Sequence, residues 1–126
     1  MATQILEWND LYCLGDANID SQHQYLFALA NIALESNDLE ALGSSVMNLF
    51  QYTRKHFHDE EEFMRSRQYS NLDEHRNQHE DLIAKLSALP SPTKENQQVL
   101  KKELHHLMLF WVLKHIIDDD SKILLN

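Results

Sequence analysis

The sequence predicts an all-α protein, an antiparallel up-down four-helix bundle with an N-terminal arm. The chain has 126 residues, which suits a single domain over 1–126 with one core. It contains only two glycines and two prolines, whereas folds built from many short strands need many turn residues. Apolar residues recur at helical spacing in four segments, which completes the prediction.

The chain opens with an arm, residues 1–18, which shows no helical period and contains a turn-forming stretch around Gly15 and Asp16. A first helix is predicted at about 19–36, because its apolar residues fall on one face. The polar pair that begins at Asn37 interrupts this pattern and marks the first connection.

Three further helices follow. The second is predicted at about 38–67, because Asp38 is a good N-cap and a long apolar stripe comes after it. The third is predicted at about 71–89 and ends before Pro90. The fourth is predicted at about 93–120. Short connections make neighbouring helices antiparallel, which gives the bundle.

Charge and composition exclude several functions. The formal net charge is −9, and an acidic surface repels phosphate backbones and anionic headgroups, so we expect neither a nucleic acid nor a membrane as partner. Cys13 is the only cysteine and cannot form an internal disulfide or a thiolate cluster. No apolar run approaches the ~20 residues of a membrane span, and the N-terminus lacks the pattern of a secretion signal. We therefore expect a cytoplasmic protein.

Polar residues interrupt the apolar stripes, and this is the unusual feature of the sequence. Burying a carboxylate or an unpaired imidazole costs on the order of several kcal/mol unless the group is hydrogen-bonded, paired or bound to a metal. A single inward histidine is usually an ordinary core residue, but here several share the same placement on all four helices. They are His23, His56, Glu60, His75, His79 and His115.

The spacing and chemistry of these residues indicate a metal site. His56 and Glu60 are four residues apart, as are His75 and His79, so each pair lies on one helix face. The set offers nitrogen and oxygen but no sulfur, which disfavours cysteine-type zinc and the all-oxygen sites of Mg²⁺ and Ca²⁺. The number of donors exceeds one tetrahedral site. It favours two six-coordinate ions bridged by carboxylate, for which iron is the natural occupant.

Four motifs, in order along the four helices, carry a resemblance to a known family. They are Ile19-Asp20-Ser21-Gln22-His23, His56-Phe57-x-x-Glu60-Glu61-x-x-Met64, Tyr69 followed by His75-x-x-x-His79, and Trp111-x-x-x-His115-Ile116 followed by Asp120. Through these motifs nearly the whole chain resembles the hemerythrins, especially the single-domain bacterial forms called bacteriohemerythrin.

The resemblance implies a cofactor of two non-haem iron ions, which an oxo or hydroxo group also bridges. One ion keeps an open position for O₂. The implied ligands are His75, His79 and His115 on one ion, His23 and His56 on the open one, and Glu60 and Asp120 between them.

Helix geometry alone does not predict Asp120. It lies five residues after His115, so an ideal α-helix turns it well away from the His115 face, whereas Asp119 at i+4 fits. The family pattern has a spacing of five and requires a distorted or ending helix. We therefore expect Asp120 as the ligand, with Asp119 as the alternative and Asp118 in solvent.

Apolar neighbours of the ligands are expected to line an O₂ pocket that excludes water, although core packing alone also explains their pattern. They are Leu26, Phe57, Trp111, Val112 and Ile116. His58, His105 and His106 lie off the ligand stripes and are expected at the surface or rim. In the acidic run 59–62 only Glu60 shares the His56 stripe, so its neighbours are expected in solvent.

The function implied by the resemblance is reversible O₂ binding for oxygen transport, storage or supply, and not enzymatic catalysis. The alternatives are sensing of O₂, redox state or NO, and a di-iron oxidase, peroxidase-like or iron-handling activity. Ferritin-type di-iron sites use two Glu-x-x-His motifs, and this chain has one such spacing, Glu103 to His106. An oxygen-using enzyme or a signalling protein remains open as a further partner.

Overall fold

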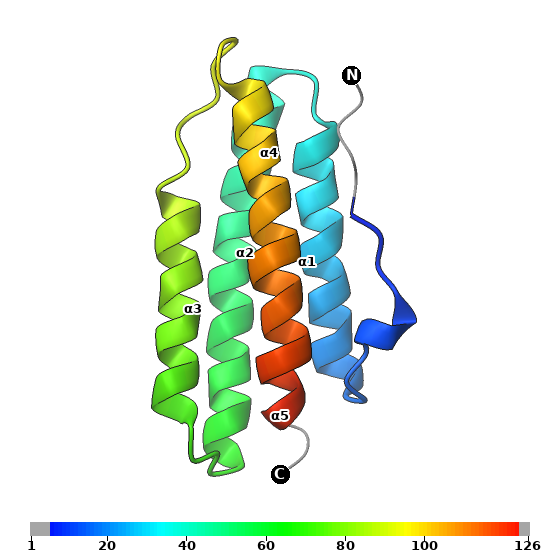
Figure 1. Cartoon of the computed structure of the whole chain (residues 1–126), viewed down its shortest axis with the longest axis vertical. Coiled ribbons are helices and arrows are strands. Elements are labelled where there is room, and N and C mark those ends of the chain that lie inside the picture. The colour runs from blue at the N-terminus through cyan, green and yellow to red at the C-terminus, as the bar shows by residue number, and fades with distance from the viewer. Residues whose placement is uncertain (1–5, 124–126) are drawn as a thin grey trace.

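The computed structural model describes residues 6–123 and consists of four long helical rods that run side by side, up and down (Figure 1). No strand occurs among these described residues, so the predicted all-α four-helix bundle is confirmed. The rods are α1 (Ala17–Glu35), α2 (Leu39–Ser66), α3 (Leu72–Ser87), and a fourth rod that begins as α4 (Gln97–Leu107) and ends as α5 (Ser121–Ile123).

Side-chain caps set the starts of the first two helices. The carboxylate of Asp16 accepts a hydrogen bond from the amide of Ile19, so α1 begins at Ala17, slightly before the predicted start. The carboxylate of Asp38 accepts hydrogen bonds from the first amides of α2, as its N-cap pattern predicts.

The fourth rod starts at Gln97 and not at the predicted residue 93, which corrects that boundary. Thr93 and Asn96 hydrogen-bond each other reciprocally: the Thr93 amide donates to Asn96 Oδ1 (2.7 Å), and the Asn96 amide donates to Thr93 Oγ1 (3.1 Å). Because the side chains satisfy these amides outside a helix, the segment forms a turn first.

The second half of the fourth rod contains two wide π-type stretches, η2 (Met108–Leu113) and η3 (Ile116–Asp120). In a regular α-helix, a residue five positions on points about 140° away. A π turn closes i→i+5 and brings that residue back to the same side. The wide turn therefore places Asp120 on the face of His115, which is the distortion that their spacing requires.

The described part of the N-terminal arm, residues 6–16, lies alongside α1 (Figure 1). The buried Asp20 carboxylate accepts hydrogen bonds from the amides of Leu14 (2.7 Å) and Gly15 (3.1 Å). Gly15 has a φ of 103°, in the left-handed region that favours glycine. Further along the arm, the Trp8 ring packs edge-on against Phe27, with 5.2 Å between centroids. This part of the arm therefore covers the outer side of α1.

The interior changes character along the bundle. α1 packs on α2 and α4, and α2 packs on α3. Where α1 ends and α4 begins, the interior is mostly apolar, and the buried Lys101 donates a hydrogen bond to the carbonyl oxygen of Ser36. The buried residues of this half include Leu34, Leu42, Leu86, Leu100 and Leu104. In the opposite half, where α3 begins and the fourth rod ends, buried histidines and carboxylates occupy the centre. The apolar half supports the fold and leaves the polar half for a site.

Candidate metal centre

All seven residues predicted as metal ligands lie together inside the polar half of the bundle. Each is at most 4% exposed, and every rod contributes at least one. They are His23 from α1, His56 and Glu60 from α2, His75 and His79 from α3, and His115 and Asp120 from the fourth rod. Their role as ligands remains a prediction, which the distances between their side chains support.

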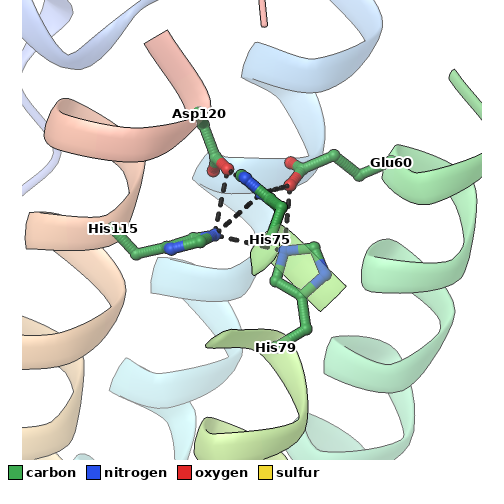
Figure 2. A group of neighbouring side chains, drawn as sticks. All are labelled: Glu60, His75, His79, His115 and Asp120. Carbon is green, nitrogen blue, oxygen red and sulfur yellow. Dashed lines mark hydrogen bonds and ion pairs between the residues drawn. The ribbon is translucent and has the colours of Figure 1, made fainter. Parts of the chain in front are cut away.

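Three of these imidazoles converge on one point, and we call His75, His79 and His115 the three-histidine group (Figure 2). The Nε2 atom of His115 lies 3.1 Å from Nε2 of both His75 and His79. Glu60 Oε1 lies 2.9 Å from His75 Nε2 and 3.0 Å from His79 Nε2. Asp120 Oδ1 lies 2.9 Å from His75 Nε2 and 3.0 Å from His115 Nε2. Five donor atoms therefore surround one position.

The other two imidazoles, His23 and His56, form the adjoining two-histidine group. Glu60 Oε2 lies 3.3 Å from His56 Nε2 and 3.6 Å from His23 Nε2. Asp120 Oδ2 lies 3.2 Å from His23 Nε2. Glu60 and Asp120 therefore each present one oxygen to the three-histidine group and the other oxygen to the two-histidine group.

Three imidazoles also have an oxygen partner at their outward nitrogen, Nδ1. At His56 and His79 the oxygen accepts a hydrogen bond, which places the proton on Nδ1 and leaves the lone pair of Nε2 facing the centre. At His115 the carboxylate forms an ion pair with Nδ1, and its negative charge favours the proton on the same atom. The pairs are His56 with Gln22 (2.6 Å), His79 with Glu61 (2.9 Å) and His115 with Asp119 (3.2 Å).

The sequence alone does not reveal these partners. Glu61 is predicted to lie in solvent, which is wrong, because its side chain is only 18% exposed and faces α3. One feature of the sequence does indicate that Glu61 faces α3. It lies four residues after Phe57, on the same face of α2, and the Phe57 ring stacks on His79 of α3. Asp119 is the i+4 neighbour that helix geometry favours, and it does reach His115, but at Nδ1. Asp120 takes the inner nitrogen, Nε2.

Buried polar atoms without hydrogen-bond partners show that the site fits cations. Both ring nitrogens of His23, Oε2 of Glu60 and both carboxylate oxygens of Asp120 lack a partner of hydrogen-bond geometry. Leaving such atoms unpaired in the interior is costly, and lone pairs facing one another at 3.1 Å repel. Cations at the two groups remove both penalties. Imidazole nitrogen with carboxylate oxygen suits iron, so the residues fit the di-iron cofactor.

In the metal-free protein, protons partly replace these cations. Burial lowers the pKa of His23, but the adjacent carboxylates of Asp120 and Glu60 outweigh it and raise the pKa to about 9. The same carboxylates outweigh burial at His75 and raise its pKa to about 9. Burial and the charge of Glu60 raise the pKa of Asp120, but His115 and His23 outweigh them and lower it to about 2.

We expect the metal-free protein to lose stability as the pH rises from about 6.5 to about 9. His23 and His75 have folded-state pKa values raised to about 9, above an unfolded value of about 6.5. Their contribution is therefore complete below pH 6.5 and lost as the pH rises through 9. Urea denaturation of the metal-free protein at pH 6.5 and pH 9 measures this effect. A midpoint that stays constant or rises would contradict the protonated network.

The residues predicted to line a pocket lie beside the site. The Phe57 ring stacks in parallel on the His79 ring, with 3.7 Å between centroids. The Trp111 ring lies over His115 at 4.7 Å, and its indole nitrogen donates to Asp81 Oδ2 across to α3 (3.0 Å). The remaining three are buried: Leu26, Val112 and Ile116.

The histidines predicted to lie outside the site are not among the converging side chains. His58 and His106 are exposed, and His105 is half-buried. Glu103 is also exposed, so the single Glu-x-x-His spacing does not point into the bundle. Asp118 is exposed, as predicted.

Fold and site together define a class of protein, a four-helix bundle whose interior carries two adjoining groups of metal-binding side chains joined by shared carboxylates. Residues 14–124 match the family described as the Hemerythrin HHE cation binding domain. The chain belongs to this hemerythrin family. None of its described helices combines the length and apolar character that a membrane crossing needs.

The chain is similar in sequence to individual members of the family over most of their lengths. The chain is 32% identical over 116 residues to a myohemerythrin of Riftia pachyptila, covering 91% of this chain and 88% of that protein. It is 26% identical over 123 residues to a bacteriohemerythrin of Clostridium acetobutylicum, covering 91% and 95%. A hemerythrin-like protein of Naegleria gruberi is 28% identical over 125 residues, covering 97% and 96%.

Proposed function

We propose that this chain binds dioxygen reversibly at a carboxylate-bridged pair of non-haem iron ions and acts in oxygen transport, storage or supply. One observation carries the proposal: Glu60 and Asp120 each present one oxygen to the three-histidine group and the other to the two-histidine group. This arrangement suits two metal ions held side by side. The pair, when bound, supplies the two electrons and the coordination position that dioxygen requires.

The two groups offer unequal numbers of protein donors. His75, His79 and His115 provide three imidazoles on one side, whereas His23 and His56 provide two on the other. With the carboxylates shared, the two-histidine group has one protein donor fewer. We assign the exchangeable position to this group. The five imidazoles contribute no negative charge, which favours reversible binding over the oxidations that carboxylate-rich sites support.

The apolar surroundings serve the same function by excluding water. The aromatic rings of Phe57 and Trp111 cover the imidazoles of His79 and His115, and the hydrogen bond to Asp81 fixes the indole of Trp111. Such a wall limits access of water and protons and so slows irreversible oxidation. Leu26, Val112 and Ile116 are assigned to this wall because they are buried next to ligands in the sequence.

Cycles of air and inert gas test the proposal. We expect the iron-loaded, reduced protein to contain two irons per chain, to gain visible charge-transfer bands in air and to lose them under inert gas, repeatedly. Optical spectroscopy and metal analysis of the same sample measure both properties.

Other outcomes would favour the alternatives. Irreversible oxidation at the first exposure, with iron retained and substrate turned over, favours an oxidase or peroxidase-like protein. Release of iron on oxidation favours iron handling. Reversible bands whose change alters binding to a separate signalling protein favour a sensor. Zinc alone, or much less than two irons per chain after iron-replete growth, contradicts the di-iron site.

A further inference from the structure

The outward nitrogens of the site histidines have partners of different charge. His79 and His115, both in the three-histidine group, face the carboxylates of Glu61 and Asp119 at 2.9 and 3.2 Å. His56, in the two-histidine group, faces the neutral amide oxygen of Gln22. The outward nitrogen of His23 has no hydrogen-bond partner. Of these four outward nitrogens, only the two in the three-histidine group face a carboxylate.

These partners act through the imidazole ring. A carboxylate that accepts the Nδ1 proton draws it away from the ring and makes Nε2 a stronger donor. A neutral amide in the same place orients the ring as well but supplies less negative charge. A stronger donor stabilises a trivalent ion more than a divalent one, because the interaction grows with the charge of the ion.

The two carboxylates are held firmly enough to exert this effect. The Glu61 side chain is 18% exposed and Asp119 is 29% exposed, so both are partly withdrawn from water. Glu61 uses Oε2 for His79, while its Oε1 lies 3.2 Å from Arg76 Nε. Asp119 lies in the wide turn that also presents Asp120 to the inner nitrogen of His115.

We propose that Glu61 and Asp119 are positioning residues that make the three-histidine group the preferred site for ferric iron, while the two-histidine group, with only Gln22 behind it, favours ferrous iron. This inference rests on the proposed di-iron site and concerns which ion is held in the higher oxidation state. It assigns a role in setting the reduction potential to two acids that do not touch the metal.

Charge-removing variants test the proposal. Glu61→Gln keeps an oxygen that accepts the Nδ1 proton of His79, and Asp119→Asn keeps an oxygen beside Nδ1 of His115, so each variant removes only the negative charge. Glu80→Gln and Asp118→Asn make the same chemical changes at exposed neighbours of the site and serve as controls. The reverse variant, Gln22→Glu, adds a carboxylate behind His56.

The readouts are the midpoint potential of the iron-loaded protein and the rate at which a ferric chelator removes its iron, both measured without oxygen. Loss of an outer partner commonly weakens metal binding about 10–100-fold. For each charge-removing variant we expect at least a ~10-fold loss of preference for ferric over ferrous iron. That loss corresponds to a rise of about 59 mV for a one-electron couple. Gln22→Glu is expected to lower the potential.

Shifts in Glu61→Gln and Asp119→Asn no larger than those in the two controls would overturn the proposal, since long-range charge would then explain them. A rise of the potential in Gln22→Glu would also overturn it. The test is separate from that of oxygen binding. If the potentials shift as expected while no reversible bands form in air, the proposed function fails and this inference stands.

Discussion

The His79→Ala variant is expected to bind metal on the order of 100-fold more weakly than the unaltered chain. Loss of a hydrogen-bond partner behind a ligand already costs up to about 100-fold, and removal of the ligand itself costs at least as much. His79 Nε2 lies 3.0 Å from Glu60 and 3.1 Å from His115, so its removal leaves an opening at the centre of the three-histidine group. Competition with a chelator, together with metal analysis, measures the loss.

His58→Ala is the matched control. It makes the same chemical change on the exposed face of α2, where the imidazole takes no part in the converging set. We expect its metal affinity to stay within about two-fold of the unaltered value, since substitutions at the surface away from a site have small effects. Equal losses of metal affinity in His79→Ala and His58→Ala would refute the placement of His79 in the site and of His58 outside it.

The Phe57→Ala variant is expected to destabilise the metal-free fold by about 3–5 kcal/mol. The ring is 5% exposed, stacks on His79 and contacts Trp111 at 6.3 Å between centroids. Its removal leaves a cavity beside the polar site, into which the surrounding rods cannot fully collapse. Urea denaturation of metal-free protein gives the free energy of unfolding without any contribution from bound ions.

The control for this change is Phe110→Ala. Phe110 lies on the same bundle but is 64% exposed. We expect its removal to change the free energy of unfolding by about 0.5 kcal/mol or less. A small effect at Phe57, comparable to that at Phe110, would show that the ring wall does not form part of the packed interior.

The helical fold was predictable because apolar spacing and capping residues act locally. The stripes of α1 and α2 and the cap at Asp38 follow from short-range rules. The cap at Asp16 was not predicted, and the predicted start of α1 was therefore too late. The start of the fourth rod was missed because Thr93 and Asn96 satisfy each other's amides within a turn. That arrangement depends on side-chain geometry that the apolar period does not record.

Part of the candidate site was predictable because polar side chains are costly to bury and therefore stand out on apolar helix faces. The inward histidines and Glu60 stand out because they interrupt apolar stripes. Asp120 does not, since only the resemblance to a family points to it and the π turn explains it afterwards. Glu61 was missed because its partner, His79, lies on another helix. The spacing of residues within one helix does not predict their contacts with a different helix.

The wide turn at the end of the fourth rod gives two consecutive acids access to opposite edges of one ring. Asp119 reaches Nδ1 of His115 and Asp120 reaches Nε2. In a regular α-helix these neighbours would point about 100° apart, and only one of them would reach the imidazole ring of His115. The number of residues in this turn matters as much as their identity. Shortening the chain here by a single position would separate the inner and outer contacts, even with every acid retained.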